Sequence, residues 1–460
     1  MRTKGSRDFT SGYLFLPMLV FTLPIMASSI LQMLYNAADK AVVGRFSGDP
    51  GAIGAIGSTG SLTSLFVALA VGLAVGAGVV VAQHFGACEE RMLSRAVHTV
   101  FIVGTVAGIA VGALGALLSR TLLEWMGTRA DIIDSAALYI RIIFCGMPAK
   151  ILYNFGASIL RSVGNSRVPL VILAFSGLLN VGLNLVFVIF LQMTVDGVAY
   201  ATIVSEYVSA IAVWFIISRR RDSVRFRFGS LCVDGRILRD VLRIGIPSGL
   251  QSSVFSLANV LIQGAVNTFP TTTVSGNAVG SSMEDFTYVT MNSFYQTVLT
   301  VTGQNVGAKR PERVRRALLY GLIQVVVAGL AVSYGSILFA DSILSLFVDG
   351  SLEEAPLILA AAKERNSVVL STYFFCGIME VLTGHLRGRG CSITPMLSSV
   401  FCSCVLRVVW VCFVFPLRHS LAFLFLCYPI SWILTNVCHT VTALVLMRRE
   451  KRLAARNENP

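Results

Sequence analysis

Residues 160–169 read LRSVGNSRVP and residues 386–395 read LRGRGCSITP, so both fit the pattern L-R-x-x-G-x-S-x-x-P, 226 residues apart. The segment AQHFGA (82–87) matches GQNVGA (303–308) in the same way, at an offset of 221. A third correspondence has an offset of 223 and consists of two residue pairs, Pro24 with Pro247 and Asn36 with Asn259. Matches in the same order at near-constant spacing indicate that the chain contains an internal duplication.

The composition identifies an integral membrane protein. Hydrophobic residues make up 55% of the chain, charged residues only 13%, and the mean hydropathy is +0.74. Soluble domains carry roughly 25% charged residues. The apolar runs are long and do not alternate, which favours membrane-spanning helices of about 20 residues over the strands of a β-barrel. We count twelve runs, at 13–44, 52–83, 96–118, 132–160, 167–191, 197–218, 243–266, 277–303, 313–340, 365–386, 393–415 and 420–447.

The duplication and the twelve runs together predict an all-α membrane protein of two six-helix halves. An even number of spans returns the chain to the side where it began, so both halves insert with the same orientation. This predicts two parallel bundles related by an axis along the membrane normal, as in some secondary transporters. We expect an N-terminal lobe at 1–218, a cytoplasmic linker at 219–242 and a C-terminal lobe at 243–460.

The distribution of charge predicts the orientation. Of the 37 basic residues, 27 fall in the segments that lie inside if the N-terminus is cytoplasmic, and six fall in the outside segments. The positive-inside rule therefore places both termini in the cytoplasm of a multi-pass plasma or inner membrane protein. This asymmetry also explains the net charge of +13 without a nucleic-acid partner. The first apolar run contains Pro17 and Pro24 and has no clean cleavage site, so we expect a retained helix and not a signal peptide.

The sequence contains no Walker loop, nucleophile elbow or zinc motif. We therefore expect no enzymatic activity, no cofactor and no ATP bound to this chain, which we expect to act as a monomer in the lipid bilayer. Duplicated bundles suit alternating-access transport, and a passive channel or a membrane scaffold remains the alternative from another class.

Ionisable and amide side chains in the first-half spans are candidates for ion binding, because a charge inside the membrane is costly and needs a reason. The candidates are Asp39, Asn180, Asn184, Thr202 and Glu206. On their helices Asn180 and Asn184 share a face, as do Thr202 and Glu206, because each pair is four residues apart. If both faces turn toward Asp39, the oxygens could hold a proton or a sodium ion. The alternatives are plain hydrogen bonds between helices and a local ion pair of Asp39 with Lys40.

The second-half candidates are Glu284, Asp285, Glu380 and Arg407. Glu284 and Asp285 are adjacent and point about 100° apart on a helix, so only one of them faces a cavity squarely. Glu380 lies deep in the tenth run. Arg407 in the eleventh run could neutralise Glu380, which would be a structural pairing.

These features resemble the multidrug and toxic compound extrusion (MATE) transporters over nearly the whole chain. The resemblance is carried by the two halves, the repeated LR-x-x-G and Q-x-x-G motifs, and a first-span pattern, which consists of Pro24, Gln32, Asp39 and Gly44. Members of the family are cation-coupled antiporters that export amphipathic, often cationic compounds. The resemblance implies a V-shaped pair of lobes, with the substrate bound between them against Phe, Tyr and Met side chains.

The resemblance also implies that Asp39 takes part in coupling to protons or sodium ions. If the coupling ion is sodium, Asp39 would be part of its binding site. DinF-like members carry an Asn and an Asp on the fifth span and a Thr on the sixth. Asn180 and Thr202 match this pattern, but Asn184 replaces the Asp, and Glu206 is a candidate to compensate. Another branch has acids on the seventh and tenth spans, where this chain has Phe255 and Cys376. The chain is therefore identified as a member of the DinF-like branch.

The function we predict is a cation-coupled (H⁺ or Na⁺) antiporter that exports amphipathic or cationic drugs by alternating access. The nearest alternative is a lipid-linked oligosaccharide flippase of the same superfamily. Such flippases carry cationic groups in their cleft, and Arg141 and Lys150 fit that requirement.

Overall fold

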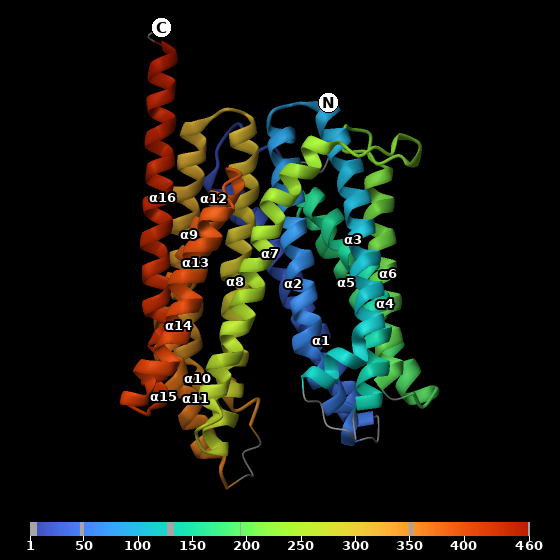
Figure 1. Ribbon diagram of the computed structural model, residues 1–460, viewed down its shortest axis with the longest axis vertical. Helices are drawn as coiled ribbons and strands as arrows, with labels where there is room; N and C mark the ends of the chain where they lie inside the picture. Colours follow the sequence, from blue (N-terminus) through green and yellow to red (C-terminus); the bar gives the residue numbers. More distant parts are fainter. Residues whose placement is uncertain (1–6, 47–49, 127–132, 194, 349–352, 459–460) are drawn as a thin grey trace. The chain divides into compact units, whose positions relative to one another are not determined.

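The computed structural model describes residues 7–46, 50–126, 133–193, 195–348 and 353–458, and within these ranges the regular structure is entirely helical (Figure 1). The helical elements of the first half are α1 (Phe15–Phe46), α2 (Pro50–Gly86), α3 (Glu90–Trp125), α4 (Ile133–Ser162), α5 (Arg167–Leu185), the π-helix η1 (Val186–Phe190), α6 (Val195–Ser218) and the 3₁₀ turn η2 (Phe228–Ser230). Those of the second half are α7 (Gly235–Val266), α8 (Thr271–Gly307), α9 (Pro311–Leu338), α10 (Ala340–Leu344), α11 (Ala355–Val369), the 3₁₀ turn η3 (Leu370–Thr372), α12 (Tyr373–Gly388), α13 (Ile393–Ser399), the π-helix η4 (Val400–Val405), α14 (Leu406–Val409), the π-helix η5 (Trp410–Val414), the 3₁₀ turn η6 (Phe415–Leu417), α15 (Leu421–Phe425) and α16 (Cys427–Glu458).

Each of the twelve predicted runs corresponds to a long helical segment in the described ranges. Helices α11 and α12 join through η3 into one segment, and the elements from α13 to η6 form another. Ten segments are long and apolar enough to cross a membrane. The other two, α7 and α8, are less apolar because α7 begins with several arginines and α8 is rich in Ser, Thr and Asn.

Contacts divide the chain into two compact units that interleave along the sequence. The first unit comprises 1–12, 23–249 and 303–310, and the second comprises 13–22, 250–302 and 311–460. In the first unit α4 packs against α2, α3 and α6, and in the second α12 packs against α9 and α16. Helices α4 and α12 hold the same place in the repeat, so the two units share a packing pattern. The predicted lobe boundaries at 218 and 243 stay a prediction.

The repeated LR-x-x-G motif ends helices α4 and α12. Gly164 and Gly390, the glycines of its two copies, both have a φ of +81°. The backbone N–H of the next residue donates to the carbonyl of the motif leucine, at 2.9 Å in the first copy and 3.0 Å in the second. This is the Schellman arrangement, which favours glycine because it needs a left-handed conformation. The motif that reveals the duplication therefore forms the C-terminal cap of a helix in both halves.

The Q-x-x-G motifs, also repeated, face each other within the first unit, where α2 crosses the end of α8. A Cβ on Gly86 would lie 1.9 Å from the carbonyl oxygen of Gln304, and one on Gly307 would lie 1.9 Å from that of Gln83. The two backbones are thus in direct contact at a reciprocal crossing. Glycine is required at both places because any side chain would overlap the opposite backbone.

The segment before α1 is anchored at this crossing. The backbone N–H of Phe9 donates to Gln304 Oε1 at 3.0 Å, and Asn305 donates to the carbonyl of Phe9 at 3.2 Å. Gln304 also donates to the carbonyl of Ser162 at 2.8 Å, next to the end of α4. The fully buried Gln304 therefore ties three distant parts of the chain together.

The arginine-rich stretch between the halves docks onto the first unit. Phe226 is buried against Phe101 and Trp214, with ring centroids 4.4 and 5.2 Å away. Polar contacts add to this, since the N–H of Arg227 donates to His98 Nε2 at 3.1 Å. Helix α7 already begins at Gly235, inside the stretch 219–242 that the sequence marks as a linker. The part of this stretch before α7 therefore packs against α3 and α6.

We predict that Gly307→Ala destabilises the protein much more than a glycine replacement elsewhere in the same unit. The added methyl group would overlap the carbonyl of Gln83, so we expect the free energy of unfolding to fall by about 3 kcal/mol. The control is Gly182→Ala on α5, where no heavy atom lies within 4 Å of the added Cβ. Thermal unfolding in detergent measures the effect, and equal midpoints for the two variants would contradict the crossing.

Candidate functional site

Four of the five first-half candidates form one connected polar group in the first unit. The Asn184 side chain on α5 donates from Nδ2 to Asp39 Oδ1 on α1 at 2.5 Å. The same nitrogen lies 3.3 Å from Asn180 Oδ1, one turn away on α5. Asn180 in turn donates to Thr202 Oγ1 on α6 at 3.5 Å. Helices α1, α5 and α6 therefore bring Asp39, Asn180, Asn184 and Thr202 together.

The carbonyl oxygen of the Asn184 side chain is buried and unsatisfied. Asn184 is 0% exposed, and within the described ranges no donor reaches its Oδ1. An unpaired buried acceptor costs free energy, so it needs a donor or a cation. Directly beyond Asn184, α5 passes into the π-helix η1, and π-helical turns are frequent at functional sites. The oxygens of Asp39 and Asn184 are thus placed to take a positive charge.

Glu206, the fifth candidate, is paired with a lysine. Lys150 Nζ on α4 lies 3.0 Å from Glu206 Oε1 on α6, and both side chains are mostly buried. Glu206 packs against Gly146, where a Cβ would lie 3.0 Å from Glu206 Oε2. The glutamate does not bond directly to Asp39 in the contacts of the described residues. The side chain of Lys40 lies outside the described residues, so its predicted pairing with Asp39 stays a prediction.

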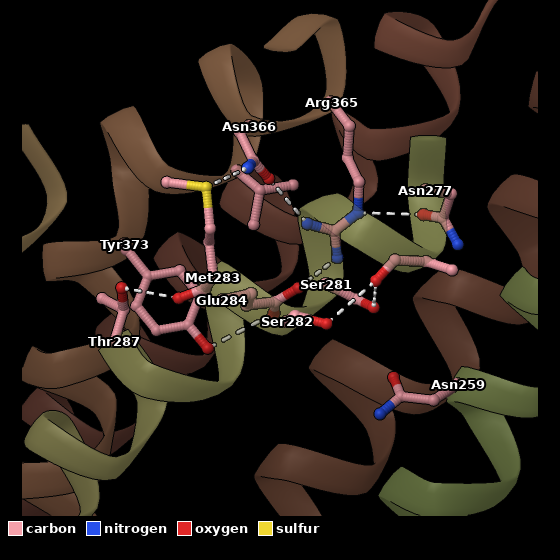
Figure 2. Close-up of polar contacts among 12 residues, drawn as sticks. Asn259, Asn277, Ser281, Ser282, Met283, Glu284, Thr287, Arg365, Asn366 and Tyr373 are labelled. Atoms are coloured by element: carbon pink, nitrogen blue, oxygen red, sulfur yellow. Dashed lines mark hydrogen bonds and ion pairs between the residues drawn. The ribbon is translucent and has the colours of Figure 1, made fainter. Parts of the chain in front are cut away.

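In the second unit Glu284 on α8 is neutralised by an arginine. Arg365 on α11 is 3% exposed and forms an ion pair with Glu284. Its other nitrogens donate to Asn277 Oδ1 at 2.9 Å and to Asn366 Oδ1 at 3.0 Å, and Tyr373 donates to Glu284 at 3.3 Å. Figure 2 shows the guanidinium held among these groups between α8 and α11. The adjacent Asp285 is exposed.

The remaining second-half candidates occupy separate places. Glu380 on α12 lies near Arg387 and Asn292, and in the described part of the chain it forms no ion pair within 4 Å. Arg407 on α14 donates from Nε to Ser431 at 3.3 Å and from Nη1 to Asn259 at 3.2 Å. In the described part of the chain no carboxylate lies within ion-pair distance of Arg407. The predicted pairing of Arg407 with Glu380 is therefore not formed, because the guanidinium turns toward α7 and α16.

The predicted tenth run, 365–386, begins at Arg365 and ends just before Arg387, so the sequence placed both arginines at its ends. Both are buried, at 3% and 6% exposed, and Arg387 bonds to Tyr295 at 2.7 Å and to Gln251 at 2.8 Å. The tenth span begins at Ala355, ten residues before the predicted run, so Arg365 lies inside it. The sequence signal that could have indicated the pair is the acidic residue Glu284 in a polar span together with a basic residue at the edge of another run.

Comparison with known proteins decides the family. A family model described as MatE matches residues 24–186 and 247–413, one match in each half. The chain belongs to the MatE family. Two relatives are "Probable multidrug resistance protein YoeA" of Bacillus subtilis, 25% identical over 84% of this chain and 83% of the relative, and "Probable multidrug resistance protein NorM" of Thermotoga maritima, 24% identical over 82% of this chain and 80% of the relative.

The MatE assignment confirms the predicted fold class. A crystal structure of a MATE mutant superposes with a TM-score of 0.89 at 21% identity, covering 98% of this chain and 100% of that chain. The chain is thus an all-α, multi-pass membrane protein with the twelve-helix MATE fold, as the sequence predicts. The placement in the DinF-like branch stays a prediction.

We predict that Asn184→Asp makes the stability of this MatE protein depend on pH. The new carboxylate would face Asp39 at hydrogen-bond distance, and two such carboxylates repel each other when both are ionised. We expect the thermal midpoint to fall between about pH 5 and about pH 8 relative to the wild type. Asn184→Ala is the control because it removes the hydrogen bond without adding charge. The same pH slope in both variants would show that residue 184 does not face Asp39.

We predict that Glu284→Gln is strongly destabilising and that a second change relieves the effect. Removing the partner of the buried Arg365 leaves an uncompensated charge, which costs about 3–5 kcal/mol. The double variant Glu284→Gln/Arg365→Met removes that charge and should recover most of the loss. Unfolding of both variants in detergent tests the pair, and an undiminished loss in the double variant would argue against it.

Proposed function

We propose that this protein is a cation-coupled antiporter that exports amphipathic or cationic small molecules across the cell membrane by alternating access, without chemical conversion. The observation that carries the proposal is the contact between Asp39 and Asn184, with the buried and unsatisfied Oδ1 of Asn184 beside it. An intramembrane carboxylate next to a free amide oxygen is suited to binding a proton or a sodium ion.

The charge balance of the first unit supports coupling to a single positive charge. With Asp39 and Glu206 ionised and Lys150 protonated, these three side chains together carry one net negative charge. One proton or one sodium ion at Asp39 would neutralise it. Because Lys150 already compensates Glu206 at 3.0 Å, the charge that changes during transport is that of Asp39.

Coupling requires that the cation and the substrate have different affinities for the states that open to the two sides of the membrane. A cation bound at Asp39 would stabilise one state, and a bound substrate would stabilise the other. The relatives named as multidrug resistance proteins support small, chemically varied compounds as the substrates. A cationic substrate would also compete with the coupling ion for negative charge.

We predict that Asp39→Asn abolishes coupling while preserving the fold. The amide keeps the size of the side chain and a hydrogen bond with Asn184, but it cannot take up a proton and is a poor sodium ligand. In everted vesicles, adding a cationic dye should release protons or sodium ions in the wild type and not in the variant. The matched control is Asp134→Asn, whose carboxylate is 80% exposed. Full cation release by the Asp39 variant would remove this residue from the mechanism.

A further inference from the structure

Arg407 is a buried cation with no carboxylate within ion-pair distance in the described part of the chain. It is 3% exposed and lies in a membrane-spanning segment, Ile393–Leu417. Of the other two buried arginines of the second unit, Arg365 pairs with Glu284, and Arg387 is held by hydrogen bonds to Tyr295 and Gln251. A charge at membrane depth is expensive and indicates a function unless a partner neutralises it.

One nitrogen of the Arg407 guanidinium is available as a hydrogen-bond donor. Nε donates to Ser431 and Nη1 to Asn259, whereas Nη2 has no hydrogen-bond partner in the described part of the chain. Asn259 on α7 is itself exposed, so the guanidinium lies next to a group at the surface of the second unit. In Figure 2, Asn259 stands apart from the dashed contacts around Arg365. An incoming group can therefore approach Arg407 beside Asn259.

Aromatic rings flank the same guanidinium. Its central carbon lies 4.1 Å from the ring centroid of Tyr428 and 5.7 Å from that of Phe255. Stacking partly offsets the charge, but it supplies no anion. It does place apolar surface beside a hydrogen-bond donor, which is the arrangement that an amphiphile with an acidic group requires.

The local backbone is irregular around Arg407. The four-residue helix α14 lies between two π-helical stretches, η4 and η5. π-helical turns are less favourable than α-helical ones and are frequent at functional sites. Simple helix packing does not require a π-helical stretch on each side of a buried charge.

The internal repeat gives an independent reason. In the first unit the polar residue Asn184 of the fifth span contacts Asp39 of the first span. In the second unit Arg407 of the eleventh span contacts Asn259 of the seventh, and Asn259 is the repeat partner of Asn36. The same pair of helices thus forms a polar contact in each unit, but with an acid in one and a base in the other.

We propose that Arg407 binds the acidic group, a carboxylate or a phosphate, of an amphiphile whose apolar part contacts Tyr428 and Phe255. Arginine suits this role because its planar guanidinium bonds such groups with two parallel N–H donors. The inference rests on the proposed export function in one respect, namely that the amphiphile is a transported compound. It extends the substrate class to zwitterionic and anionic compounds.

The test uses three matched fluorescent probes: pyrenebutyrate, its methyl ester and the corresponding trimethylammonium compound. Binding is measured with the full-length protein in phosphatidylcholine nanodiscs. A charge-assisted hydrogen bond contributes about 1.5–3 kcal/mol, so we expect the wild type to bind pyrenebutyrate at least about tenfold more tightly than the ester. Arg407→Gln should remove this preference and leave the affinity for the ester unchanged.

Two further variants control the test. Arg407→Lys keeps the positive charge but lacks the paired donors of the planar guanidinium, so it should retain part of the preference for the acid. This variant tests the role of Arg407 if Arg407→Gln fails to fold. Arg418→Gln removes an exposed arginine of the same unit and should change nothing. Equal binding of pyrenebutyrate and the ester by the wild type, or an unchanged preference in Arg407→Gln, would overturn the proposal.

Two additional measurements separate the possible sources of the ligand and the two proposals. If phosphatidylglycerol in the nanodiscs displaces pyrenebutyrate from the wild type but not from Arg407→Gln, the acidic group is that of a lipid and the transported-compound assignment is overturned. Acid-selective binding without substrate-driven cation release in vesicles would overturn the coupling proposal alone. Cation release with no selectivity for the acid would overturn the Arg407 proposal alone.

Discussion

The crossing of α2 over the end of α8 is the constraint on which the first unit depends. Two glycines in matching motifs let the backbones touch, and the side chain of Gln304 then uses both of its polar atoms on distant segments. In a membrane, helix association gains little from the hydrophobic effect, so close backbone contact and hydrogen bonding carry more of the stability. This explains why the motifs consist of an amide and a small residue.

The duplication has preserved the scaffold and altered the chemistry. Both LR-x-x-G copies end their helices with the same glycine conformation, and α4 and α12 pack against equivalent neighbours. The polar residues differ. In the first unit Asp39 contacts the amide of Asn184, whose oxygen is unsatisfied. In the second unit Glu284 is paired with Arg365. There, Arg407 of the eleventh span contacts Asn259 of the seventh. Two copies of one architecture can thus hold groups of opposite charge.

The sequence predicted the helices and the fold because long apolar runs and an internal repeat leave few arrangements in a bilayer. Helical spacing placed Asn180 and Asn184 on one face and Thr202 and Glu206 on another, but the sequence could state only as a condition that these faces turn toward Asp39. It did not predict the pairing of Arg365 or the docking of Phe226. Such contacts join residues far apart in sequence, and periodicity carries no information about the partner. The polar stretch 363–366 separates the apolar residues 355–362 from the rest of the tenth span, so the predicted run missed its first ten residues.

The anchoring of Phe9 has a consequence for how the chain is made. Its partner Gln304 lies 295 residues later in the sequence. At a synthesis rate of about 5–20 residues per second, the N-terminal segment waits roughly 15–60 s for that partner to leave the ribosome. During this interval the first unit lacks the part of its packing that Gln304 supplies. Completion of the N-terminal half is thus timed by translation of the C-terminal half, which gives membrane chaperones and proteases a defined period in which to act.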